Sequence, residues 1–168
     1  MKCIKKLVAL TLAAVLALAM LTACSGTPSV PEATDEAKQI VDNINAVRTG
    51  NGLSALESNT AAMDVANKIL ALQEKKELGL ISEEDYKKEK RELYVIQVDG
   101  RSSGGYITVV APSSGVKSLT EKGWQEMYDV NDLRRSDCRI VRSAETKYVG
   151  VAIKQISNGK YIAVVMTY

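Results

Sequence analysis

The chain has 168 residues, with 22 Lys and Arg, 20 Asp and Glu, seven Tyr and one Trp, and it contains neither His nor Phe. Three of the basic residues and none of the acidic ones lie in residues 1–23, so the remainder carries a formal charge of −1 and lacks the basic excess typical of nucleic-acid binding. The absence of His removes the commonest metal ligand and the commonest general base.

The first 24 residues have the pattern of an export leader. Three lysines precede an uncharged apolar run at 7–21, which is shorter than the roughly 20 residues that a membrane span needs. The segment LTAC that ends at Cys24 resembles the bacterial lipobox, in which the cysteine is lipidated and becomes the first residue of the mature protein. We therefore predict a signal peptide over 1–23, acyl chains such as palmitate on Cys24, and an extracytoplasmic protein held on the cell membrane by that lipid.

Residues 24–36 contain two prolines among small and acidic residues, which indicates a tether to a single domain over 37–168. Cys138 is the one cysteine that remains in this domain, so no intrachain disulfide is expected. It is either a thiol made reactive by neighbouring arginines or a small, half-buried residue at the start of a strand.

Hydrophobic periodicity predicts helices over 37–49, about 59–78 and about 83–94, the last of them highly charged and solvated. Period-two patterns then predict strands over 95–98 and 106–111, followed by a helical stretch over 116–133. Two β-rich runs, 148–153 and 161–165, flank Asn158-Gly159, which favours a closing hairpin with a type I′ turn. This order predicts an α+β fold in which helices pack on a small antiparallel sheet.

The segment INAVRTGNGLSAL at 44–56 resembles the first-helix signature of the CAP superfamily of cysteine-rich secretory, antigen 5 and pathogenesis-related proteins. The position of Trp124 and the YVGVA…NGKY pattern of the last two strands are also similar to that family. The resemblance covers about residues 37–72 and 105–168 and implies a CAP-like α–β–α sandwich with a central cleft.

The same resemblance implies that this chain lacks the site of the family. Intact CAP sites carry two His and two Glu, whereas the corresponding positions here include Thr108 and a position near Val130, and only Glu126 lies close to a family carboxylate. One carboxylate does not provide the three or four converging ligands that a metal needs. We therefore expect no metal and no cofactor.

A second resemblance lies within residues 72–93. The sequence LQEKKELGLISEEDYKKEKREL is similar to the SHOCT motif, a short helical hairpin that is thought to mediate association in other bacterial proteins. Any capped helix-Gly-helix turn could converge on the same residues, so an ordinary surface hairpin is the alternative. The motif would make residues 72–93 a self-association or partner-binding element.

These observations favour a non-catalytic binding or scaffold domain at the cell envelope over an enzyme. If the cleft binds a ligand such as a wall fragment or an envelope protein, the residues expected beside it are Thr108, Trp124, Glu126 and Tyr128, with Thr108 and Trp124 partly exposed. The alternative is a hydrolase with a non-standard site that combines Glu126 with loop serines at positions 102, 103, 113 and 114.

Overall fold

The computed structural model describes residues 34–95, 105–111 and 119–168. The predicted leader, Cys24 and most of the tether lie outside the described residues, as do positions 96–98 of the expected strand and the four loop serines. None of the described helices is both long enough and apolar enough to cross a membrane.

The sheet has the strand order β1-β3-β4-β2. Strands β2, β4 and β3 pair antiparallel, and the two-residue β1 adds a short parallel edge beside β3. In the described part of the chain the elements follow in this order: α2 (Asp35–Gly50), β1 (Glu57–Ser58), α3 (Thr60–Glu77), α4 (Glu83–Val95), β2 (Gly105–Ala111), α5 (Glu121–Asp129), α6 (Ser136–Arg142), β3 (Tyr148–Gln155) and β4 (Tyr161–Thr167).

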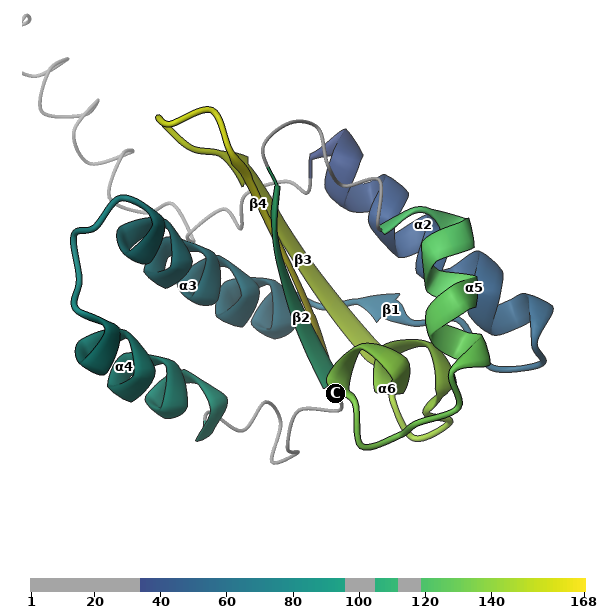
Figure 1. Ribbon diagram of the computed structural model, residues 1–168. Coiled ribbons are helices and arrows are strands. Elements are labelled where there is room, and N and C mark those ends of the chain that lie inside the picture. The colour runs from purple at the N-terminus through teal and green to yellow at the C-terminus, as the bar shows by residue number, and fades with distance from the viewer. Residues whose placement is uncertain (1–33, 96–104, 112–118) are drawn as a thin grey trace, which may run out of the picture. The chain divides into compact units, whose positions relative to one another are not determined.

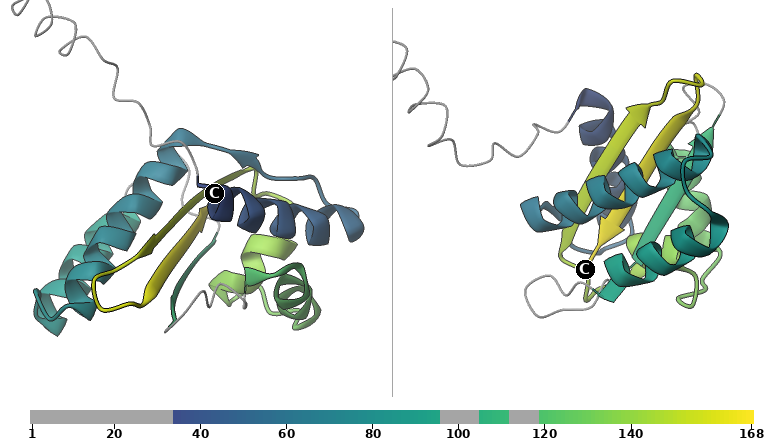
Figure 2. Two further views of the ribbon diagram at one scale, coloured as in Figure 1. Left: turned by 90° about the horizontal axis from the view of Figure 1, so that it is seen from above. Right: turned by 90° about the vertical axis from the view of Figure 1, so that its left-hand side faces the viewer.

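Helices cover both faces of the sheet. Figures 1 and 2 show α2, α5 and α6 on one side of the strands and α3 with α4 on the other. The domain has two hydrophobic cores, one on each face of the sheet. The side chains of β4 contribute to both, because neighbouring strand residues point to opposite faces. Ala163 and Val165 pack with the α2 side, whereas Ile162, Val164 and Met166 pack with α3. The expected α+β sandwich with a small sheet is confirmed, with the addition of one short parallel pair.

The helix boundaries follow the capping residues in the sequence. Thr34 caps α2 by accepting from the Ala37 amide, and Asn59 caps α3. The α3 helix ends at Glu77, and the chain turns at Gly79, whose φ of 67° allows Leu80 to donate to the Lys75 carbonyl at 2.8 Å. Ser82 then begins α4 by accepting from the Asp85 amide at 3.0 Å, as the capping pattern predicts.

Three expectations about local structure are wrong. Val95 is the last residue of α4 and not the first of a strand. In the described part of the helical stretch expected over 116–133, residues 119–133, α5 is the one α-helix, because the chain turns at Asn131, which has a φ of 55°, before α6 begins. The β3–β4 turn is not type I′, since of its residues Gly159 alone has a positive φ, and the Gly159 amide donates to the Ile156 carbonyl.

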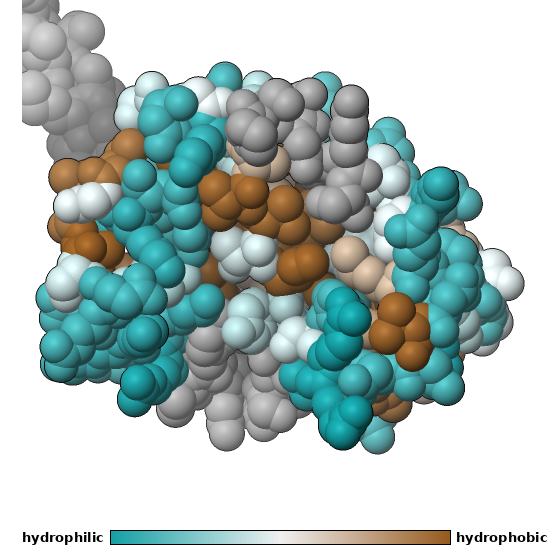
Figure 3. Space-filling view, viewed as in Figure 1, coloured by the Kyte–Doolittle hydropathy of each residue, from teal (hydrophilic) through white to brown (hydrophobic). Residues whose placement is uncertain are grey.

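Strand β2 forms an edge of the sheet and contains no charged residue. Its residues after Gly105 are half-buried. Figure 3 shows apolar atoms gathered between the hydrophilic surfaces of the helices on the two sides, over this edge. The strand therefore contributes side chains to both cores while part of its apolar surface stays accessible.

Candidate functional site

The structure separates the residues that the CAP resemblance assigns to a cleft. Thr108 shares a face of β2 with Tyr106 and Val110, which pack towards α3. Trp124 belongs to the core on the opposite, α2 face of the sheet. Strand alternation therefore prevents Thr108 from lining the same cleft as the α5 residues. Its hydroxyl oxygen is buried without a hydrogen-bond partner among the described residues.

Trp124 is a core residue and not part of a surface pocket. Its side chain is 0% exposed, and the indole N–H donates to the Leu119 carbonyl at 3.0 Å. A tryptophan that is fully enclosed and hydrogen-bonded presents no stacking surface to a ligand. The partial exposure expected of a binding tryptophan is thus absent, and Trp124 instead holds α5 against the core.

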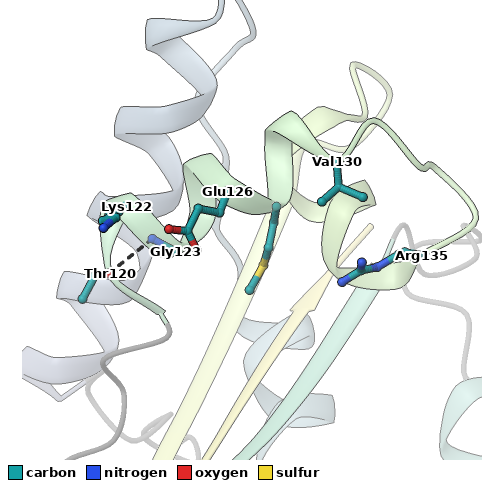
Figure 4. Close-up of a pocket in the computed structure, with 7 residues that line it drawn as sticks. Thr120, Lys122, Gly123, Glu126, Val130 and Arg135 are labelled. Carbon is teal, nitrogen blue, oxygen red and sulfur yellow. Dashed lines mark hydrogen bonds between the residues drawn. The ribbon is translucent and has the colours of Figure 1, made fainter.

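Glu126 does line a pocket, of about 400 Å³, along α5. Figure 4 shows Lys122 and Arg135 at opposite ends of this pocket, with Glu126 between them. The Thr120 hydroxyl accepts from the Gly123 amide at 3.3 Å and so serves as the cap of α5. Met127 and Val130 complete the lining. The pocket offers hydrogen bonds and opposite charges to a ligand, but no base held beside a nucleophile.

Arg135, which lines the pocket, already forms an ion pair, as does its neighbour Arg134. The Arg135 guanidinium donates to the Asp137 carboxylate at 2.5 Å, and Arg134 pairs with Asp132 at 3.1 Å. The hydrogen bond from Arg135 lowers the pKa of Asp137, and the same contact raises the pKa of Arg135. Arg135 therefore reaches the pocket as a cation that already has an anionic partner.

Tyr128 lies outside that pocket, towards α6. The guanidinium carbon of Arg142 lies 4.4 Å from the centre of its ring, and Arg142 also donates to the Tyr128 carbonyl. This cation–π contact and hydrogen bond fasten α5 to α6. Tyr128 is half-buried, and its established contacts are structural.

The residues at the family's metal positions do not fit a metal ion. Thr108 offers a neutral hydroxyl on the wrong face of the sheet, and Val130 has no donor atom. Among the described residues no group of three or more His, Cys, Asp and Glu residues is arranged to hold a metal.

Cys138 lies inside α6, so its expected place at a strand start is wrong. The residue is 0% exposed, and burial raises the pKa of its thiol in spite of the neighbouring Arg135. A buried thiol with a raised pKa is a poor nucleophile and behaves as a small apolar side chain.

Arg48 is the buried polar residue whose role the sequence did not indicate. Its guanidinium is fully enclosed and donates to four backbone carbonyls, at distances of 2.9–3.3 Å: Ser54, Ile140, Ser143 and Thr146. Two of these carbonyls lie at the C-terminal end of α6, where the helix dipole favours a positive charge. Burial lowers the pKa of Arg48. Arg48, which belongs to the first-helix pattern, thus cross-links α2, α6 and the segment that precedes β3.

The second candidate surface is the hairpin formed by α3 and α4. Tyr86 is a buried residue of α4, and its hydroxyl donates to the side-chain oxygen of the buried Gln73 at 2.6 Å. The ammonium groups of Lys76 and Lys90 lie 4.3 and 5.3 Å from the centre of the Tyr86 ring. These contacts fix α4 to α3 at one point. Leu80, at the bend, is 72% exposed.

No family model matches the sequence, and no curated protein matches it either. Two solved structures of CAP superfamily proteins are similar to the folded chain. The hookworm platelet inhibitor has 12% identity, covers 80% of this chain and 69% of its own, and gives a TM-score of 0.47. BmVAL-1 has 14% identity over 84% of this chain and 80% of its own, with a TM-score of 0.43.

Proposed function

We propose that this chain is an envelope lipoprotein, anchored through Cys24, whose CAP-like domain is a non-catalytic scaffold that presents the α3–α4 hairpin. The leader supports export and lipidation, since charge, apolar length, small residues and the cysteine occur together in residues 1–24. The partners expected are membrane lipid through the acyl chains and an envelope or cell-wall component through the domain.

One observation carries the scaffold proposal. The position aligned with the family's cleft is filled by Trp124, whereas a groove of about 440 Å³ is open between α3 and α4. Open surface is where a partner can bind. The lack of His also supports a scaffold. A hydrolase built on Glu126 would have to activate its nucleophile without histidine, the commonest general base.

The anchor is tested with Cys24→Ala in the full-length chain. We expect the variant to lose acyl label and to leave the detergent phase, because a thioether-linked lipid cannot form on alanine. Ser25→Ala is the matched control and should keep both properties. Equal labelling and equal membrane retention of Cys24→Ala would contradict the lipoprotein assignment.

The contact surface is tested by photo-crosslinking in intact cells. A benzoylphenylalanine residue replaces Leu80 at the hairpin bend or, as the control position, Lys122 beside the α5 pocket. We expect crosslinks to envelope proteins, including this chain itself, from position 80 and not from position 122. Crosslinks from position 122 alone would show that a partner binds at the α5 pocket and not at the hairpin.

A further inference from the structure

The groove between α3 and α4 has walls of opposite charge. Lys68 and Lys75 line it on α3, and Glu89 and Glu92 line it on α4. Apolar carbons form the rest of the lining, from Ala71, Leu72 and Leu93. A groove of this kind suits a helix that carries both signs of charge beside an apolar stripe.

The charges on the two walls do not form ion pairs with each other. Within the described residues, no ion pair or hydrogen bond joins Lys75 to Glu89 or Glu92. The contacts that hold α4 to α3 lie elsewhere, in the Tyr86 cluster and in the pair between Lys76 and Glu83 at 3.1 Å. Lys68 pairs with Asp64 of the same helix at 2.5 Å, but its side chain is 50% exposed, and such an exposed pair is weak. Lys68, Lys75, Glu89 and Glu92 therefore remain accessible to an external partner.

The spacing of these residues makes each wall a continuous stripe. Lys68, Leu72 and Lys75 stand at i, i+4 and i+7 on α3, and Glu89, Glu92 and Leu93 stand at i, i+3 and i+4 on α4. Such positions lie on one side of a helix. Each hairpin thus carries one basic edge and one acidic edge, both next to apolar side chains.

We propose that the occupant of this groove is a second copy of the same hairpin. A two-fold axis brings the acidic α4 edge of one copy against the basic α3 edge of its partner, and repeats the contact in the reverse sense. The four helices then pack as a small bundle. The charges select this occupant, because a uniformly anionic wall polymer would be repelled by Glu89 and Glu92, and a uniformly cationic one by Lys68 and Lys75.

This proposal rests on the proposed function in one respect, the lipid anchor. Seven residues line the groove, fewer than the roughly 20–30 residues a side of a stable interface, so we expect the free domains to pair weakly. Anchoring both copies in one membrane raises their effective concentration, which favours a weak two-fold contact. Pairing is therefore a property of the membrane-bound protein.

The experiment uses the full lipidated chain in phosphatidylcholine vesicles. Glu84→Cys, exposed on α4, is labelled with a donor or an acceptor dye, and Cys138 stays unlabelled because it is buried. One variant carries Lys68→Glu with Lys75→Glu, and the other carries Glu89→Lys with Glu92→Lys. The control reverses two charges that do not line the groove, Lys87→Glu with Arg91→Glu.

We expect energy transfer between wild-type copies and in the control. In each groove variant alone the apparent pairing constant should fall about tenfold or more, because attractive pairs become repulsive. Mixing the two groove variants should restore transfer, which a merely unfolded protein cannot do. Unchanged melting temperatures confirm that the variants fold.

Two outcomes would overturn the proposal. One is wild-type energy transfer that stays at the level of randomly distributed labels at every surface density. The other is a mixture of the two groove variants that pairs no better than either alone. If Leu80 then crosslinks a different envelope protein in cells, the scaffold function stands and the second copy is the wrong occupant. If Cys24→Ala keeps its label, the anchor fails independently of the groove.

Discussion

The α2 face and the α3 face of the sheet are closed by different kinds of contact. On the α2 face, Arg48 joins groups that lie more than 90 residues apart in the chain, and Trp124 fills the space between α5 and the strands. On the α3 face, the outer helix α4 is held by Tyr86 to its sequence neighbour α3. Long-range buried contacts make the first face part of the cooperative fold, and α3 packs on the sheet in the same way. The outer helix α4, in contrast, is held by local contacts, which leave it able to adapt to a partner.

Replacement of Arg48, on the α2 face, should lower the free energy of unfolding more than any other change proposed here. In Arg48→Met, carbonyl groups that now receive hydrogen bonds from the guanidinium remain buried without donors. We expect the free energy of unfolding to fall by about 3–5 kcal/mol. Chemical denaturation measures the change. Arg134→Met, in which the side chain is 93% exposed, is the control and should change stability little.

Gly150→Ala tests the close approach of α3 to the sheet. A methyl group at this position would lie 2.2 Å from backbone atoms of Ala62 and Met63, which cannot move as a flexible side chain does. We expect a loss of about 2–3 kcal/mol from overpacking. Gly50→Ala, with nothing within 4 Å of the added methyl, serves as the control in the same thermal unfolding measurement. Equal melting temperatures for the two variants would disprove the tight contact.

Tyr86→Phe should affect the hairpin and spare the rest of the domain. The change removes the hydroxyl that donates to Gln73 and leaves a buried acceptor unpaired, at a cost of about 1–2 kcal/mol. Native-state hydrogen exchange should show faster exchange in α4 while the amides of β4 keep their protection. Tyr161→Phe on β4 is the matched control. Faster exchange throughout the domain would mean that the two faces unfold as one unit.

The smallest effect is expected at the contact between α3 and the β3–β4 turn. The Lys160 ammonium lies 2.8 Å from the Glu77 carboxylate and lowers the pKa of Glu77. Because Glu77 has a lower pKa in the folded state, its ionised form stabilises the fold at pH values above the unfolded-state pKa of about 4.3. This stabilisation is lost as the pH falls through the folded-state pKa. Glu77→Gln should therefore cost under about 1 kcal/mol at pH 7 and have no effect at pH 2–3. Urea titrations at both pH values measure the difference.

Local sequence signals predicted the α3–α4 hairpin well. The bend at Gly79 and the cap at Ser82 depend on side chains within a few residues of each other, so the sequence contains the whole interaction. The groove between the helices was not predicted. Its charges are ordinary surface residues until the docking angle of α4 on α3 places them on facing walls.

The candidate cleft shows the opposite result. Sequence similarity placed Thr108 and Trp124 at one site, but the pleat of β2 puts Thr108 on the face away from α5. The error arises because an alignment gives positions along the chain and not the face to which a side chain points. Cys138 was misplaced for a related reason, since the arginines beside it in sequence do not show that α6 buries it.

By itself the sequence determined the class of fold and most helix ends, because periodicity and capping act between residues close in the chain. It also determined what the chain lacks, since no fold can supply a histidine. Only the tertiary structure decided that Arg48 joins α2 to α6, that Trp124 is enclosed, and that the open groove lies between α3 and α4. These features depend on which distant segments meet, and that is fixed by packing of the whole domain rather than by any local pattern.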